Sequence, residues 1–195
     1  DCQLKTGKTI WVAGHSGPET AEDFRTHFGI FAPGVTQLFP EGHILNLHPW
    51  EYNEVPVMIG AALKTDVPII ALHLTRPAII IPDRDKLGMD SHFAAAQGAY
   101  IIKDYNDDRQ KDGVVLVRGT SVISELCKIL PKIISDGPNV KIIAVLSWGL
   151  FNMQTEAYKM SLIKADEWLD CMVITNTSIG NMRHWVKHPL VAKYS

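Results

Sequence analysis

Residues 43–75 read HILNLHPWEYNEVPVMIGAALKTDVPIIALHLT, and this stretch decides the fold class. It opens with a short apolar run, residues 43–47, that a proline soon ends, as expected of a strand. Residues 51–64 carry acidic side chains in their first turn and an apolar stripe at helical spacing, which predicts a helix. Residues 67–75 form another apolar run of strand length. A strand, a helix and a strand in this order favour a parallel sheet with helices on its faces.

The same alternation of strands and helices continues on both sides of this stretch. Upstream, residues 9–14 form a short apolar run ended by glycine, which is typical of a buried strand. Downstream, we expect strands at residues 98–102, 114–117, 140–145 and 171–175, the first of them at a sheet edge. One helix is predicted from an N-cap at Ser121 to about Leu130, where Pro131 limits it, and another over residues 154–161. The predicted fold class is therefore α/β, with two segments that each hold a mainly parallel sheet flanked by helices.

The composition excludes several classes of protein. The 195 residues are 46% hydrophobic and 21% charged, with a net charge of −2, which is the balance of a soluble globular protein. Lys and Arg form no cluster that suits nucleic acid, and no apolar run approaches the roughly 20 residues that span a membrane. The cysteines Cys2, Cys127 and Cys171 are scattered, which favours reduced thiols in a cytoplasmic protein. Asp1 is not an initiator methionine, so we expect the parent chain to begin further upstream.

A dense polar segment follows the first predicted strand. Residues 15–27 hold two histidines, three carboxylates and an arginine. Ligands of open α/β sheets bind outside the carboxyl ends of strands, so this loop is a candidate site, and a solvated loop is the alternative. Arg76 follows another apolar strand, where a guanidinium suits a phosphate or carboxylate or else forms a surface ion pair.

Other candidates have simpler interpretations. Residues 119–121 lie at a strand–helix junction that could hold an anion on its N–H groups, but a plain N-cap is favoured. His73 lies within a predicted strand and is expected to be a hydrogen-bonded core residue. The five tryptophans are dispersed, and core packing is their expected role. The sequence contains none of the common nucleotide-loop, zinc-protease, serine-hydrolase or EF-hand motifs.

Four motifs in order make the sequence similar to the transketolase family. In transketolases a strand is followed by a histidine that opens H-D-S, and after eleven residues by a second histidine that closes E-D-G-P-T-H. His15 opens this pattern, and residues 22–27, EDFRTH, close it at the same spacing. Residues 74–76, LTR, resemble the family's L-[ST]-R strand ending. Residues 119–122, GTSV, loosely resemble its T-G-S-E-V. Residues 145–158, VLSWGLFNMQTEAY, resemble its M-P-x-x-x-x-F-x-x-Q-x-x-x-Y.

The resemblance implies a domain organisation. Residues 1–82 would be the C-terminal half of a pyrimidine-binding domain, residues 83–97 a linker, and residues 98–195 a transketolase C-terminal-like domain. The cofactor would be thiamine diphosphate with a divalent metal such as Mg, bound mainly by parts expected upstream of Asp1 or in a partner subunit. This chain alone would bind no cofactor and would be inactive. The family also implies a homodimer and sugar phosphate substrates, with no nucleic acid or membrane partner.

The resemblance also assigns roles to residues. His27 and His15 would be catalytic, with His27 assisting proton transfer at hydroxyls near the reacting carbon. Asp23 would accept a hydrogen bond from a substrate hydroxyl and select its configuration. His15 and Arg76 would hold the distal phosphate of the sugar.

Two departures from the family pattern keep other functions open. Residues 16–19, SGPE, replace the Asp-Ser and glycine-rich part, and Phe24-Arg25 replaces the usual Gly-Pro. The added bulk and charge could serve a different sugar, as in a phosphoketolase or a dihydroxyacetone synthase. A non-catalytic regulatory or assembly module that retains the fold is a further alternative to the transketolase-type transferase.

Overall fold

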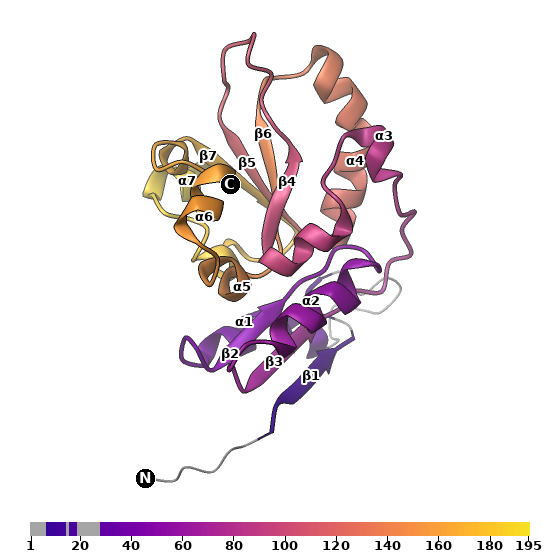
Figure 1. Cartoon of the computed structure of the whole chain (residues 1–195), viewed down its shortest axis with the longest axis vertical. Coiled ribbons are helices and arrows are strands. Elements are labelled where there is room, and N and C mark those ends of the chain that lie inside the picture. The colour runs from indigo at the N-terminus through magenta and orange to yellow at the C-terminus, as the bar shows by residue number, and fades with distance from the viewer. Residues whose placement is uncertain (1–6, 15, 19–27) are drawn as a thin grey trace.

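The computed structural model describes residues 7–14, 16–18 and 28–195, and within them it has two sheets that lie one beside the other along the molecule (Figure 1). The first sheet has the order β1-β3-β2 and the second the order β4-β6-β5-β7. The strands are β1 (Thr9–Ala13), β2 (Ile44–Leu47), β3 (Ile69–His73), β4 (Ala99–Lys103), β5 (Val114–Arg118), β6 (Lys141–Val145) and β7 (Cys171–Thr175). All pairings are parallel except that of β4 with β6, which confirms the α/β class and the edge position of β4.

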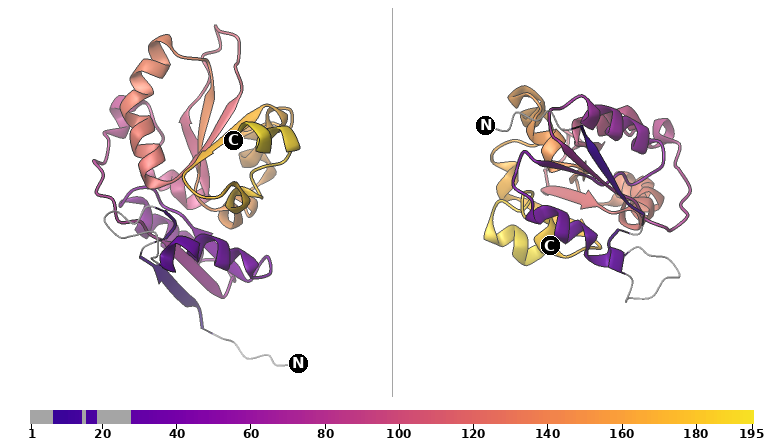
Figure 2. Two further views of the ribbon diagram at one scale, coloured as in Figure 1. Left: turned by 180° about the vertical axis from the view of Figure 1, so that it is seen from behind. Right: turned by 90° about the horizontal axis from the view of Figure 1, so that it is seen from below.

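Short helices connect these strands. The α-helices are α1 (Ala32–Val35), α2 (Glu54–Leu63), α3 (Arg84–Leu87), α4 (Thr120–Asp136), α5 (Trp148–Asn152), α6 (Glu156–Leu162) and α7 (Pro189–Tyr194). The 3-10 helices are η1 (Phe28–Phe31), η2 (Thr36–Leu38), η3 (His92–Gln97), η4 (Glu167–Leu169) and η5 (Ile179–Met182). In the second sheet α4 lies on one face, and α6 and α7 lie on the other (Figures 1 and 2). No described helix is long and apolar enough to cross a bilayer.

Strand β1 is present as predicted, but the expectation that it is buried was wrong. It lies at the edge of its sheet, where β3 is its partner in the described part of the chain. Ile10, Trp11 and Val12 are 44%, 40% and 55% exposed. Trp11 therefore also departs from the expected core role of the tryptophans, which Trp50 and Trp185 do fulfil.

Helix α4 differs from its prediction at both ends. Its N-cap is Gly119, not Ser121, and Gly119 has a φ of +123°, with Asn176 Oδ1 only 2.8 Å from where a Cβ would be. The helix does not end near Leu130 but runs through Pro131 to Asp136. An interior proline removes one backbone hydrogen bond, and the buried apolar face of the helix compensates for that loss.

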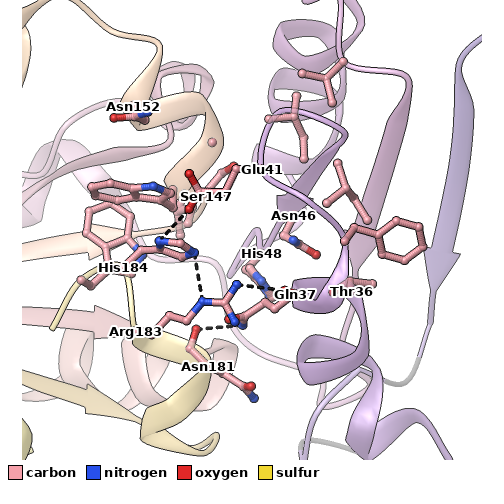
Figure 3. Close-up of a pocket in the computed structure, with 18 of the residues that line it drawn as sticks. Thr36, Gln37, Glu41, Asn46, His48, Ser147, Asn152, Asn181, Arg183 and His184 are labelled. Atoms are coloured by element: carbon pink, nitrogen blue, oxygen red, sulfur yellow. Dashed lines mark hydrogen bonds and ion pairs between the residues drawn. The ribbon is translucent and has the colours of Figure 1, made fainter.

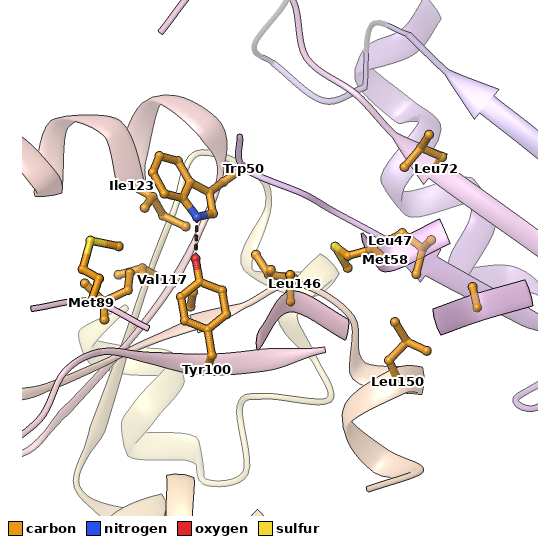
Figure 4. Close-up of a cluster of buried hydrophobic side chains, with 14 of the residues drawn as sticks. Leu47, Trp50, Met58, Leu72, Met89, Tyr100, Val117, Ile123, Leu146 and Leu150 are labelled. Carbon is orange, nitrogen blue, oxygen red and sulfur yellow. Dashed lines mark hydrogen bonds between the residues drawn. The ribbon is translucent and has the colours of Figure 1, made fainter. Parts of the chain in front are cut away.

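The largest apolar core contains side chains from both sheets (Figure 4). Leu45, Leu47 and Ile70 of the first sheet belong to the same cluster as Tyr100 and Val117 of the second. A second cluster fills the opposite face of the four-stranded sheet, beneath α5, α6 and α7. Packing therefore joins the two sheets directly.

Segment 83–97, predicted to be a linker, contains α3 and η3 and contributes to the interior. Met89 is part of the large core, and Arg84 is buried. The division of the chain at these boundaries stays a prediction. Cys127 and Cys171 are buried free thiols, as expected.

Candidate functional site at the junction of the two sheets

The carboxyl ends of the parallel strands in both sheets meet at one junction. Directly after β2, the N–H of His48 donates to the carbonyl of Leu146, which follows β6, at 2.9 Å. After β3, the hydroxyl of Thr75 donates to the hydroxyl of Thr120 at the start of α4, at 2.8 Å. Since ligands of α/β proteins bind at the carboxyl ends of parallel strands, this junction is the candidate site.

His73, the last residue of β3, is the centre of a buried polar network. Its Nδ1 lies 2.5 Å from the Ser16 hydroxyl, and its Nε2 lies 3.0 Å from Asn46 Oδ1 and 3.2 Å from the Thr36 hydroxyl. These contacts assign the tautomer in which Nε2–H donates to Asn46 and Nδ1 accepts from Ser16. Burial, and then the positive charge of Arg118, lower the pKa of His73 to about 3. The interpretation of His73 as a hydrogen-bonded core residue is confirmed.

His48 stacks on His73 with ring centroids 4.4 Å apart and an interplanar angle of 10°. Burial, the charge of Arg118 and His73 hold the pKa of His48 well below its ordinary value. Both imidazoles are therefore neutral at physiological pH and act as hydrogen-bonding groups rather than cations.

Arg118, the last residue of β5, is the buried cation of the junction. Its guanidinium donates to the carbonyl of Asn181 at 3.2 Å and to the hydroxyl of Thr177 at 3.1 Å. Burial lowers its pKa to about 10, so the side chain stays protonated near neutral pH. The junction therefore carries a positive charge in its interior.

Two cavities adjoin Arg118 and His48. The larger, of about 170 Å³, is lined by polar side chains that include Asn46, Ser147 and Asn181 (Figure 3). The smaller, of about 30 Å³, contacts Ser16, His73, Thr75 and Thr177. Arg118 and His48 line both cavities, so a ligand in the larger one would meet the guanidinium.

An aromatic wall closes the larger cavity on the side of the second sheet. The Trp148 ring stacks on His184 with centroids 5.5 Å apart, and Trp185 packs edge-on against it at 5.1 Å. The Lys187 ammonium lies 4.1 Å from the centroid of the Trp148 ring. Arg183 links this wall to η2 by donating to the carbonyl of Gln37 at 2.9 Å (Figure 3).

The four site residues predicted from the sequence are only partly described. His15, Asp23 and His27 lie outside the described residues. Arg76 is exposed just after β3. Ser16, which follows His15, donates its N–H to the carbonyl of Leu74 at 2.8 Å, so the segments after β1 and β3 meet at the junction. Whether the four side chains share one cleft stays a prediction.

Sequence reasoning missed His48, Arg118 and Asn181. The signal that selected Arg76, a guanidinium directly after an apolar strand, is also present at Arg118. His48 and Asn181 carry no local signal because only the contact between the two sheets brings them together.

Several known proteins that are similar to this chain in sequence are transketolases. No protein-family model matches the chain. Transketolase 10 of Craterostigma plantagineum is 25% identical over 166 residues, covering 84% of this chain and 23% of that protein. The chloroplastic transketolase of the same plant is 28% identical over 163 residues, which is 82% of this chain and 29% of that protein. Staphylococcus epidermidis transketolase is 26% identical over 160 residues, 81% of this chain and 23% of that protein.

Solved structures show the same fold. A transketolase variant from Pichia stipitis superposes with a TM-score of 0.67 at 22% identity, covering 87% of this chain and 23% of that one. Campylobacter jejuni transketolase superposes with a TM-score of 0.65 at 19% identity, covering 91% of this chain and 26% of that one.

The fold and the junction define an α/β protein whose two parallel-rich sheets enclose a polar, positively charged site between their strand ends. The resemblance suggested by the sequence motifs is confirmed: this chain is similar to transketolases in sequence and in fold. It spans only about a quarter of the length of the curated relatives it matches.

Proposed function

We propose that this chain is part of a thiamine diphosphate-dependent transferase of the transketolase type, which moves a two-carbon ketol unit between sugar phosphates. The observation that carries the proposal is the meeting of two motif segments. The hydrogen bond from Ser16 N to Leu74 O joins the chain just after His15 to the chain just before Arg76. The family resemblance implies that His15 and Arg76 hold the phosphate of the sugar, so the segments that carry them are expected to lie together.

The chain's own residues would bind and orient the sugar. Arg76 and His15 would pair with the distal phosphate, since a guanidinium fork suits phosphate oxygens. Asp23 would accept a hydrogen bond from a substrate hydroxyl and so disfavour the wrong epimer. His27 would move a proton at the hydroxyls near the reacting carbon.

The cofactor requires groups beyond those described in this chain. Thiamine diphosphate would supply carbanion stabilisation when bound, and its diphosphate is held through a divalent metal such as Mg. Among the described residues, no group of three or more His, Cys, Asp or Glu side chains could hold a metal ion. We propose that the remaining parts of the enzyme, or a partner subunit in a homodimer, bind the cofactor.

The first experiment compares two proteins: this 195-residue chain alone, and the protein of the complete parent reading frame. Both are assayed for transfer from a ketose phosphate to an aldose phosphate with thiamine diphosphate and Mg. We expect turnover only in the complete protein. Turnover by the chain alone would overturn its role as a part, and a complete protein without turnover would favour the non-catalytic module.

The second experiment tests Arg76. In the complete protein, Arg76→Ala should raise KM for phosphorylated substrates about tenfold or more, equivalent to roughly 1.4 kcal/mol, because one charged pair to phosphate is lost. KM for an unphosphorylated ketol donor should change little. Arg109→Ala, which removes an exposed arginine bonded to the Gly137 carbonyl, is the matched control. Equal losses on both classes of substrate would contradict the phosphate role.

A further inference from the structure

Arg118 and Arg84 are the two buried arginines of the described chain, and their surroundings differ. Arg84 donates to Glu51 at 2.9 Å and to Glu54 at 2.8 Å. Arg118 is 5% exposed, yet its hydrogen bonds go to two neutral acceptors, Asn181 O and Thr177 Oγ1. In the described part of the chain, no carboxylate oxygen lies within 4.0 Å of the Arg118 guanidinium nitrogens.

A buried cation without a counter-charge is unfavourable. Removing a guanidinium from water costs free energy that an anion nearby normally offsets. The titratable neighbours His48 and His73 cannot supply a negative charge, because an imidazole is either neutral or cationic. Burial and the charge of Arg118 lower the pKa of both rings and keep them neutral. The arrangement is typical of a site that is completed by an anionic ligand.

The surroundings of Arg118 leave room for such a ligand. A guanidinium has five N–H groups in a planar fork that suits two oxygens of a phosphate, and two bonds to the protein use only part of it. The adjoining cavity of about 170 Å³ exceeds the needs of one water molecule. Its wall carries amide and hydroxyl groups from Asn46, Ser147 and Asn181, which can bind the hydroxyls of a small polyol (Figure 3).

We propose that the junction cavity is a binding site for a phosphate monoester, with Arg118 holding the phosphate and Asn46, Ser147 and Asn181 facing the hydroxyl-bearing part. Arg76 lines neither of the two cavities. We therefore propose this site as a second one, distinct from the phosphate position proposed at Arg76. The inference does not depend on ketol transfer.

Thermal unfolding of the chain tests the site, with inorganic phosphate and an aldose phosphate as probes. Both probes should raise the Tm of the wild type in a saturable way, because a ligand that binds only the folded state stabilises it. Arg118→Met should lose this response, with at least a tenfold weaker affinity. Arg109→Met, at an exposed arginine, should respond like the wild type. A response that Arg118→Met retains would overturn the proposal.

The same variant in buffer free of oxyanions gives an independent outcome. If Arg118 lacks a partner there, Arg118→Met should be at least as stable as the wild type, because an apolar side chain replaces a buried, unpaired charge. A variant that is less stable than the wild type, or that does not fold, would show that the charge is already paired within the chain and would overturn the proposal.

A measurement on the wild type needs no substitution. Phosphate should shift the NMR signals of the Arg118 Nε–H group and of the His48 ring, which line the cavity together. Shifts confined to Arg76 would place phosphate at the other site and overturn this proposal while leaving ketol transfer open. Shifts at Arg118 without transfer activity in the complete protein would support the phosphate site in the cavity and overturn the proposed ketol transfer.

Discussion

His73 shows how a residue that titrates in free peptides becomes a fixed structural group. Its ring bonds to Ser16, Asn46 and Thr36, which lie on three separate segments of the first half of the chain. Each partner suits the neutral ring, and a proton on Nδ1 would force the Ser16 hydroxyl to accept instead of donate and would put a positive charge in a buried site close to Arg118. The network is therefore most stable while His73 is uncharged.

This gives a prediction for the pH dependence of stability. His73 has a folded-state pKa of about 3, against 6.5 for the ordinary side chain. Between these values the unfolded chain binds a proton that the folded chain does not, so the free energy of unfolding falls as pH falls from 6.5. The contribution reaches about 1.4 kcal/mol per pH unit. Urea unfolding at several pH values should show a shallower slope for His73→Gln, and parallel curves for the two proteins would refute this.

At the scale of elements, the start of β4 is fixed by a glycine. Gly98 has a φ of +85°, and its carbonyl accepts from both Leu146 N and Ser147 N at 2.8 Å. A Cβ at this position would overlap the carbonyl oxygen of Ser147 and lie 2.5 Å from Phe151 N. The antiparallel edge strand can therefore join β6 only through a residue without a side chain.

Two glycine substitutions should have opposite effects. Gly98→Ala should lower the free energy of unfolding by about 3 kcal/mol or more, because both the backbone angle and the backbone contacts oppose a side chain. Gly60→Ala, inside α2 with no atom within 4 Å of the new Cβ, should raise it by about 1 kcal/mol. Chemical denaturation measures both changes, and similar effects from the two variants would contradict the argument.

At the scale of the whole molecule, a buried ion cluster ties α2, the loop before it and β4 to segment 83–97. Glu54, at the start of α2, accepts from Arg84 at 2.8 Å and from the Tyr100 hydroxyl of β4 at 2.6 Å. Glu51 binds the same guanidinium, and the rings of Trp50 and Tyr100 lie 5.4 and 5.3 Å from it. Side chains from α2, from the loop before it and from β4 therefore depend on one arginine of segment 83–97.

Removing that arginine should destabilise the whole fold. Arg84→Met leaves the carboxylates of Glu51 and Glu54 buried without their cation, which costs about 3–5 kcal/mol. Because the cluster joins α2 and β4, far-UV circular dichroism and tryptophan fluorescence should report one common transition at lower denaturant. Lys86→Met, at an exposed pair with Asp83, should change stability by less than about 0.5 kcal/mol. A loss below about 1 kcal/mol for Arg84→Met would refute the role of the cluster.

The local sequence pattern predicted where strands and helices occur better than it predicted how they are buried or where they end. Strands β2, β3 and β5 to β7 and helix α2 follow from short-range apolar spacing, which depends only on neighbouring residues. The burial of β1 and the end of α4 were predicted wrongly because each depends on a distant segment. Whether a strand lies at an edge, and whether an apolar face compensates for a proline, cannot be learned from adjacent residues.

The sequence by itself determined the α/β class, the resemblance to transketolases, and the placement of polar residues after the strands. Only the tertiary structure decided that the carboxyl ends of two sheets face each other and that His48, His73 and Arg118 share one buried junction. The physical reason is that periodicity acts over a few residues. The burial of a charge and the shape of a cavity depend on segments tens of residues apart that meet only when the chain has folded.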